Sequence, residues 1–357
     1  MRWLTKMLLL SSVLSSSLYG FGAEPETRGM ADDPLATEPI VADVSAWDGR
    51  VPRSVLDLGD PRFFSVHAFV VDKQHRSLTI WKRNTDAVER IGIYPIDFGR
   101  SLGDKRYLGD HRTPEGIYFF QEKLEEKDLD FSLYGSRAFT MDYPNFFDRL
   151  DGKTGSGIWL HAVPDTTSLN RGSRGCVVVR NEVIKRLSDY VNLRKTPILV
   201  QDSIDLVSGE EARRSKEAMA QWLNRWRKAW EEKDIEQYIQ FYSDHFKAMG
   251  MNRDKWLQYK KGLNSTYKSI RVVLSQPTLL QHKDRVIVRV LQVYQSDQHS
   301  DFGEKTLYLK KESDSWQILN EEWSPVNDQA LAASLMQTPD AGRSIAQSVK
   351  PSDVVHD

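Results

Sequence analysis

The pattern of hydrophobic and polar positions changes its period near residue 203. Between 61 and 202, short apolar runs are separated by polar or glycine-containing turns, and this pattern is typical of β-strands. The predicted strands cover 65–72, 77–82, 88–96, 117–120, 157–161, 176–179 and 196–200. One stretch, 181–191, instead places apolar residues on one face of a helix. The region from 61 to 202 is therefore predicted to be a mostly β domain with short helices.

A polar linker is predicted at 203–214, and beyond it the apolar residues recur at helical spacing. Trp222, Trp226 and Trp230 lie four residues apart, and the stripe continues to Phe246. An aromatic stripe of this kind is usually a buried helix face rather than a ligand site. Alternating segments follow at 269–274, 285–294, 305–310 and 316–323. Helices followed by antiparallel strands predict an α+β domain from 215 to 325, with a long amphipathic helix packed on a curled antiparallel sheet.

The two ends of the chain have different compositions from these domains. Arg2 and Lys6 flank the start of an apolar, serine-rich stretch, and Gly20 and Gly22 suit a cleavage site, so 1–22 is predicted to be a secretory signal. Its apolar part is shorter than the ~20 residues of a membrane-spanning helix. We expect an exported, periplasmic protein with no transmembrane anchor after signal cleavage. Residues 23–60 are predicted to be a linker or lead-in, and 326–357 a disordered polar tail.

Charge and cysteine content narrow the possible chemistry. The formal net charge is −1, which argues against a nucleic-acid partner. Cys176 is the only cysteine, so it cannot form the internal disulfide that explains most cysteines of exported proteins. A reactive thiol, intermolecular pairing or an inert buried side chain remain as explanations. The sequence has no His-Glu-x-x-His or paired-cysteine motif, and we expect no metal and no cofactor.

Cys176 and His161 both lie at the edges of short apolar runs, joined by a loop that contains Pro164 and Gly172. A free thiol has a pKa of ~8.5, and a nearby imidazole can accept its proton and stabilise the thiolate. We therefore expect Cys176 as nucleophile and His161 as general base and acid. Gly175 allows close approach of the backbone, and its N–H is expected to contribute to an oxyanion hole. Ser173 is expected to orient the same turn.

These residues match a known motif. His161, followed by Ser173-Arg174-Gly175-Cys176-Val177, resembles the motif of the L,D-transpeptidase (YkuD-like) catalytic domain. The segments 93–99, 109–116 and 196–198 resemble three further parts of that domain in the same order, so the resemblance covers about 62–202. It implies a mostly β, L,D-transpeptidase-like catalytic fold. Arg174 and Arg112 lie inside the matching motifs and are expected to bind substrate carboxylates.

Two positions depart from the pattern of the family. Many members have glycine directly after the histidine, where this chain has Ala162. Many have arginine two residues after the cysteine, where this chain has Val178. The nucleophile, the base and the turn are therefore carried over from the resemblance, but a complete binding site is not.

The resemblance implies a peptidoglycan-modifying cysteine acyltransferase whose partners are stem peptides. Cys176 would attack the L-centre carbonyl of diaminopimelate in a tetrapeptide, release D-alanine and form a thioester. Transfer to an amine would give a 3-3 cross-link, which is our first expectation. Transfer to water would trim the tetrapeptide to a tripeptide, which is L,D-carboxypeptidase activity.

The predicted C-terminal domain resembles NTF2-like domains. The combination of the two domains is similar to that of the L,D-carboxypeptidases that determine cell shape in helical bacteria. This resemblance rests on architecture alone. Glycan or a cell-wall protein is the expected partner of the C-terminal domain.

The order and spacing of the histidine and the cysteine differ from those of other classes of cysteine enzyme. Papain-like proteases place the histidine well after the cysteine, caspases place it ~50 residues before, and sortases have a wider gap. A non-enzymatic, exported scaffold that binds peptidoglycan and carries an inert thiol stays open as an alternative.

Overall fold

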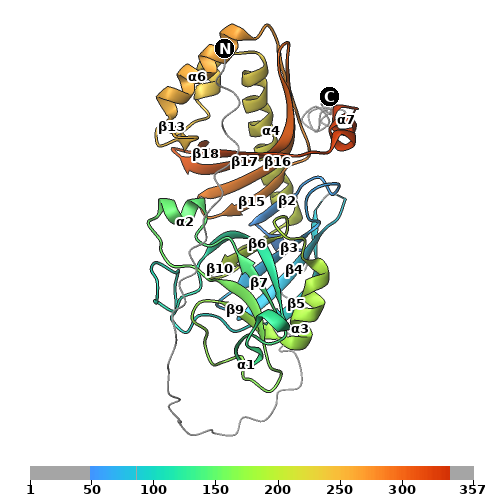
Figure 1. Cartoon of the computed structure of the whole chain (residues 1–357), viewed down its shortest axis with the longest axis vertical. Helices are drawn as coiled ribbons and strands as arrows, with labels where there is room; N and C mark the ends of the chain where they lie inside the picture. The colour runs from blue at the N-terminus through green and yellow to red at the C-terminus, as the bar shows by residue number, and fades with distance from the viewer. Residues whose placement is uncertain (1–48, 86, 338–357) are drawn as a thin grey trace, which may run out of the picture. The chain divides into compact units, whose positions relative to one another are not determined.

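The computed structural model describes residues 49–85 and 87–337, and its two largest elements are an eight-stranded and a six-stranded β-sheet (Figure 1). The predicted signal at 1–22 lies outside the described residues. Within the described part of the chain, no helix is both long and apolar enough to cross a membrane.

The eight-stranded sheet has the strand order β5-β4-β3-β10-β6-β7-β8-β9. Its strands are β3 (His67–Asp72), β4 (Ser77–Arg83), β5 (Val88–Pro95), β6 (Gly116–Glu125), β7 (Arg137–Met141), β8 (Trp159–Val163), β9 (Val177–Arg180) and β10 (Pro197–Gln201). Two pairs, β3 with β10 and β8 with β9, are parallel, and the other neighbouring pairs are antiparallel. The strands predicted from the sequence are present. The pattern of apolar residues did not predict β7.

The two edge strands of this sheet meet through the chain that follows β5. Asp97 N–H donates to Val178 O at 2.9 Å, and Val178 N–H donates to Asp97 O at 2.8 Å. A second bridge joins Gly99 to Ser173. The residues around the single cysteine are therefore held between β8 on one side and the segment 97–100 on the other.

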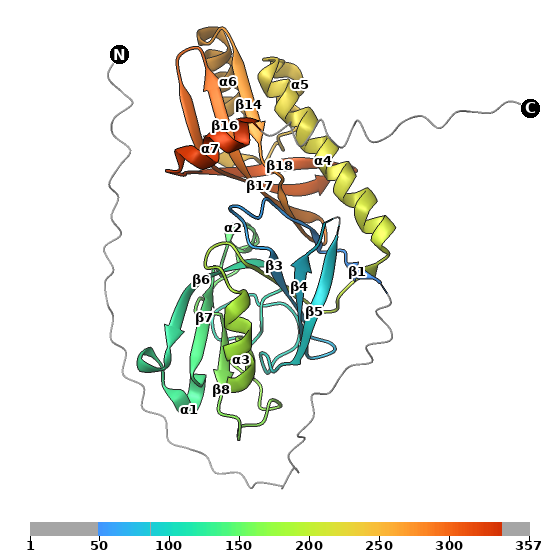
Figure 2. The same cartoon turned by 90° about the vertical axis from the view of Figure 1, so that its right-hand side faces the viewer.

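Alternate residues of the strands form an apolar core. Phe120, Phe139, Leu160 and Val177 are all at most 1% exposed within it. Helix α3 (Asn181–Leu187) packs against β7, β8 and β9 (Figure 2) and continues into a 3-10 turn at Ser188–Tyr190. The shorter helices of this region are α1 (Phe131–Tyr134), α2 (Phe146–Leu150) and a 3-10 turn at Glu126–Asp128.

The six-stranded sheet belongs to the C-terminal domain, as the alternating pattern predicts. Its strands are β14 (Ile270–Leu274), β15 (Thr278–His282), β16 (Arg285–Ser296), β17 (Ser300–Glu312) and β18 (Ser315–Pro325), with β2 (Val55–Leu58) as an added edge strand. The helices are α4 (Gly209–Glu231), α5 (Ile235–Ile239) and α6 (Arg253–Thr266), and a small hairpin pairs β12 (Lys247–Ala248) with β13 (Met251–Asn252). The alternating pattern did not predict β15.

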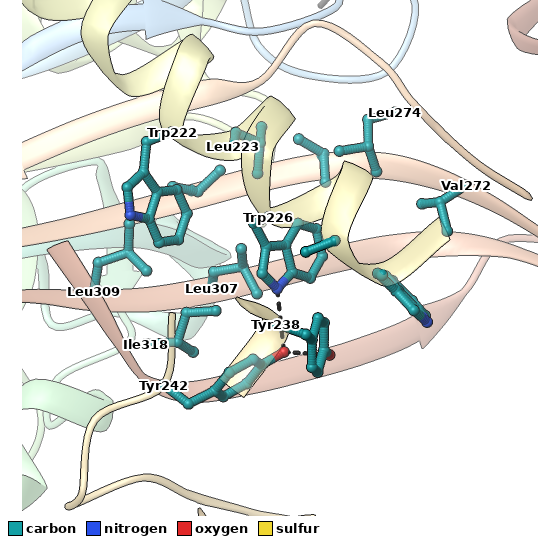
Figure 3. Close-up of a cluster of buried hydrophobic side chains, with 14 of the residues drawn as sticks. Trp222, Leu223, Trp226, Tyr238, Tyr242, Val272, Leu274, Leu307, Leu309 and Ile318 are labelled. Atoms are coloured by element: carbon teal, nitrogen blue, oxygen red, sulfur yellow. Dashed lines mark hydrogen bonds between the residues drawn. The ribbon is translucent and has the colours of Figure 1, made fainter. Parts of the chain in front are cut away.

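The tryptophan stripe forms the interior of this domain. Trp222, Trp226 and Trp230 of α4 are buried, and Trp226 Nε1 donates to Tyr242 Oη at 3.2 Å (Figure 3). Burial of each such ring stabilises the fold by roughly 2–3 kcal/mol. The predicted helical run ends early, at α4, because Lys233 takes a left-handed φ of 58° and Asp234 caps a new helix, α5.

Three segments differ from their predicted lack of structure. In the predicted lead-in 23–60, β2 pairs with β15, and β1 (Val51–Pro52) pairs with β11 (Leu206–Val207) inside the predicted linker. In the predicted tail, helix α7 (Gln329–Gln337) buries Leu335 in a small core with Phe64 and Val293. The strands and the helix within these segments are short, and their apolar residues find partners that are distant in sequence.

Candidate active site

The cysteine and the histidine are placed by two parallel strands. In the β8–β9 register, Leu160 lies opposite Val177 and His161 opposite Val178. Leu160 and Val177 face the apolar core, so His161 and Val178 face the other side of the sheet. Cys176 directly precedes β9, and the alternation of side chains assigns it to the same face as His161. The two residues singled out in the sequence are thus on one face of one strand pair.

His161 is fixed by its own strand. The residue is 5% exposed, and Nδ1 lies 2.7 Å from Ala162 O. A carbonyl oxygen only accepts, so Nδ1 carries the proton and Nε2 keeps its lone pair. The Tyr134 ring packs edge-on against the imidazole, with 5.2 Å between centroids. Burial lowers the pKa of His161 to about 4, although the hydrogen bond to Ala162 opposes this shift. The imidazole is therefore neutral at pH 7 and can act as a base through Nε2.

The thiol of Cys176 is also neutral in this structure. Its Sγ donates to Gly157 O at 3.6 Å. Burial raises the pKa of the thiol to about 11, while the Trp159 N–H and the charge of Lys105 act in the opposite direction. Among the described residues, no hydrogen bond joins Sγ directly to the His161 ring. The resting pair is a thiol and a neutral imidazole rather than a preformed ion pair.

A short turn presents the cysteine. Ser173 Oγ donates to Cys176 O at 2.7 Å and accepts from Gly175 N–H at 3.0 Å. Gly175 has a φ of +131°, and a Cβ there would lie 2.7 Å from Arg112 O. Glycine is therefore required by both conformation and space.

The Gly175 N–H donates to the Ser173 hydroxyl in this structure, and its expected role as an oxyanion donor stays a prediction. The hydroxyl is only two residues away and satisfies the N–H locally, as Ser side chains often do in turns.

The loop from 99 to 116 closes over the turn. A Cβ on Gly99 would lie 2.4 Å from His111 O, and Gly99 N–H donates to Thr113 Oγ1 at 2.9 Å. This close packing brings the Arg112 carbonyl against Gly175. The segment 109–116, noticed in the sequence as a motif, is thus part of the site's wall.

A buried ion pair braces the same loop. Lys105 Nζ lies 2.7 Å from Asp110 Oδ1, and both side chains are 3% exposed. Burial alone would raise the pKa of Asp110, but the hydrogen bonds from Lys105 and from three backbone N–H groups hold it well below its usual range. Asp110 and Tyr134 were not predicted as site residues. Asp110 could have been noticed from its place in the 109–116 motif, whereas Tyr134 carried no signal. Lys105 is one of several cationic residues near the motif in the sequence, and the structure pairs it with Asp110.

The two candidate substrate arginines border the turn. Arg112 contacts it through its carbonyl, and Arg174 is exposed within it. Within 49–85 and 87–337, neither guanidinium has a hydrogen-bond or ion-pair partner, so both remain predicted carboxylate ligands. The departures Ala162 and Val178 are both buried. In the same ranges, no group of three His, Cys, Asp or Glu residues is arranged to hold a metal ion.

Comparison with known proteins covers both domains. Residues 67–200 match the model of the L,D-transpeptidase catalytic domain, and 218–322 match that of the Cds6 C-terminal NTF2-like domain. The structure of Bd1075 from Bdellovibrio bacteriovorus is 48% identical, with a TM-score of 0.74, over 78% of this chain and 100% of that chain.

Two more distant relatives share parts of this arrangement. The helical cell shape determining protein Pgp2 from Campylobacter jejuni has the same fold, with 24% identity and a TM-score of 0.60 over 75% of this chain and 95% of that chain. The putative L,D-transpeptidase YafK of Escherichia coli K12 is 24% identical over 135 residues, which are 38% of this chain. The chain spans about half, 48%, of the length of that curated relative.

Proposed function

Since this chain belongs to the L,D-transpeptidase (YkuD-like) family and carries a Cds6-type NTF2-like domain, we propose that it is a peptidoglycan-modifying cysteine acyltransferase. The observation that carries the proposal is the shared face of Cys176 and His161, with Nδ1–H held by Ala162 O and Nε2 left as a base. The proposed substrate is a stem tetrapeptide that ends in diaminopimelate and D-alanine.

The first half-reaction follows from the protonation states of the resting site. His161 Nε2 takes the proton of the Cys176 thiol as the sulfur attacks the L-centre carbonyl carbon of diaminopimelate. The carbonyl electrons move to oxygen, and the Cys176 N–H is the proposed donor to this oxyanion because Gly175 N–H is already bonded to Ser173. Collapse of the intermediate breaks the C–N bond, and the imidazolium gives its proton to the departing amine of D-alanine. A thioester on Cys176 remains.

The neutral resting pair has a consequence for this step. A thiol with a pKa near 11 and an imidazole with a pKa near 4 do not exchange a proton before substrate arrives. Proton transfer is then coupled to attack, and the developing imidazolium and oxyanion stabilise each other. The charge of Lys105 and the Trp159 N–H favour the sulfur anion at that moment.

For the second half-reaction we favour water as the acceptor. The support is the two-domain architecture, which resembles that of the L,D-carboxypeptidases that determine cell shape and is shared in fold with the helical cell shape determining protein Pgp2. Hydrolysis of the thioester leaves a tripeptide. This tripeptide can no longer act as an acyl donor, because a donor stem must release D-alanine when it forms a cross-link. Such trimming lowers the number of stems available for cross-linking and forms no cross-link itself. Transfer to an amine of a neighbouring stem, giving a 3-3 cross-link, is the other outcome that experiment can reveal.

The test incubates the purified protein with disaccharide tetrapeptide and follows D-alanine, products and intact protein mass. We expect D-alanine release and tripeptide, with loss of both in Cys176→Ala and His161→Gln. Ser168→Ala, in the exposed loop before the turn, is the control. Unchanged turnover by Cys176→Ala would overturn the nucleophile. A 3-3 dimer would assign transpeptidation, and binding of sacculi without any product would favour the scaffold.

We also propose that the C-terminal domain binds glycan or a cell-wall protein. The residue chosen to test this role is Lys260, which is 6% exposed and whose Nζ lies 4.3 Å from the Trp230 ring centroid and 4.6 Å from that of Trp256. Burial lowers the pKa of Lys260 to about 8. A sacculus pull-down with Lys260→Met should show reduced binding relative to Lys255→Met, an exposed position on the same helix. Equal binding by both variants would count against this role.

Export to the periplasm is part of the same proposal. It rests on the signal predicted at 1–22 and on the location of the proposed substrate. Expression in a Gram-negative host should give a periplasmic protein whose intact mass lacks the signal. A full-length cytoplasmic product would contradict it.

A further inference from the structure

The hairpin that joins β15 and β16 contacts the catalytic domain with two cations. Lys283 Nζ lies 3.1 Å from Glu115 Oε2. Arg285 donates to both oxygens of Asp151, from Nη1 to Oδ2 at 2.9 Å and from Nη2 to Oδ1 at 2.6 Å. The Arg285 guanidinium also lies 5.0 Å from the centroid of the Phe147 ring. We call residues 282–285 the hairpin tip.

The first carboxylate anchors one wall of the active site. Glu115 Oε1 lies 2.7 Å from the buried Lys73 Nζ, which also donates to Gly103 O at 3.0 Å. Glu115 N–H donates to Asp104 Oδ1 at 2.9 Å. Glu115 therefore ties together both ends of the loop that supplies Lys105 and the Arg112 carbonyl.

The second carboxylate belongs to Asp151, at the start of the segment 151–157. This segment ends at Gly157, whose carbonyl accepts the hydrogen bond of the Cys176 thiol. Two residues after Asp151, Lys153 Nζ bridges Asp148 and Asp104, at 2.9 Å from each. Thr154 N–H then donates to Arg106 O at 3.0 Å.

Both segments that surround the thiol are thus anchored, at the ends away from it, by cations of the hairpin tip. We propose that Lys283 and Arg285 are positioning residues, through which the C-terminal domain holds the segments 103–115 and 151–157 in the geometry needed for acyl transfer. The expected change in kcat rests on the proposed function. The expected change in the mobility of the two segments does not. We expect a substitution in the C-terminal sheet to change the surroundings of the Cys176 thiol, although the substituted residue does not contact the substrate.

One buried carboxylate and one two-point contact distinguish these ion pairs from incidental surface pairs. Glu115 is 6% exposed at its side chain, although Lys283 is 67% exposed. Asp151 and Arg285 are 26% and 20% exposed and form a two-point contact. Two parallel hydrogen bonds fix orientation as well as distance, which a single exposed ion pair does not.

The experiment compares the full chain with Lys283→Met/Arg285→Met and with Lys228→Met as control. Lys228 lies in the same domain and its ion pair with Glu232 is exposed, so Lys228→Met shows the effect of losing one exposed charge, against the two charges lost in the double variant. In the double variant we expect kcat for D-alanine release to fall about tenfold with KM unchanged, because misplacement of catalytic groups by a fraction of an ångström has effects of this order. Amide hydrogen exchange should accelerate in 103–115 and 151–157 but not in β8 and β9.

Two further variants separate positioning from loss of folding. Exchange of the charges in Asp151→Arg/Arg285→Asp should restore most of kcat that Arg285→Asp alone loses. Arg285→Lys, which keeps the charge but not the two-point contact, should lie between the wild type and Arg285→Met. The inference would be overturned if amide hydrogen exchange in both segments stayed unchanged in the double variant. It would also be overturned if Asp151→Arg/Arg285→Asp did not restore kcat. If the wild type releases no D-alanine, the proposed function fails, while hydrogen exchange still decides whether the tip positions these segments.

Discussion

The fit of Gly175 against the loop allows a prediction with an internal control. Gly175 has a φ of +131°, and a Cβ would lie 2.7 Å from Arg112 O and 3.0 Å from Ile158 Cδ1. Gly152 also has a positive φ, +69°, but a Cβ there would meet nothing within 4 Å. Replacing each glycine with alanine therefore separates the cost of backbone conformation from the cost of crowding.

The magnitudes follow from these two environments. Alanine at Gly152 should cost about 1 kcal/mol, the usual penalty of a left-handed conformation. Alanine at Gly175 carries a larger conformational cost, since a φ of +131° lies outside the left-handed region, and it adds overpacking of about 1–3 kcal/mol. We expect a total near 3 kcal/mol, or about 2 kcal/mol more than at Gly152.

Chemical denaturation of both variants measures these free energies of unfolding. Release of D-alanine provides the second readout, since relief of the clash must move Gly175 or the Arg112 carbonyl and so displace the adjacent Cys176. Gly152→Ala should keep its turnover, and Gly175→Ala should lose at least tenfold. Equal destabilisation of the two variants, or full activity in Gly175→Ala, would refute the account of how this turn is packed.

Three other substitutions test the electrostatics and hydrogen bonds of the site. The pKa of His161 is about 4 in the folded protein, against an ordinary 6.5, so the unfolded chain binds a proton at a higher pH than the folded protein does. The contribution of His161 to the free energy of unfolding is therefore fully present above pH 6.5 and is lost as the pH falls towards 4. A difference of that size corresponds to about 3 kcal/mol, which His161→Gln should remove from the pH dependence of unfolding. Ser173→Ala breaks two hydrogen bonds and should cost about 1–2 kcal/mol and slow acyl transfer, with Ser173→Thr as the partial rescue. Lys105→Met leaves Asp110 buried without its cation, which should cost about 3–5 kcal/mol, and it should slow alkylation of the only thiol at pH 8. A pH dependence unchanged by His161→Gln, or a stability unchanged by Lys105→Met, would contradict the respective argument.

Local patterns were sufficient where the physical cause is local. Short continuous apolar runs predict β8 and β9 because these strands are buried on both faces, and helical spacing predicts α4 because its tryptophans share one side. The motif around Cys176 could be read from the sequence for the same reason, since a turn and its glycine are determined by neighbouring residues. The structure adds the shared face and the tautomer of His161, which depend on strand register.

Sequence alone thus determined the two domains, the nucleophile and base to be tested, and the family. Only the tertiary structure decided which N–H groups are free, which charged side chains are buried, and which contacts fix the loop 99–116 beside Cys176. The Gly175 N–H donates to the Ser173 hydroxyl, and β2 pairs with the distant β15 because edge pairing depends on a partner far along the chain. The contacts of Glu115 with Lys73 and Lys283 have the same origin. Hydrogen bonds and ion pairs between distant segments depend on how the whole chain packs, and no local pattern of residues encodes them.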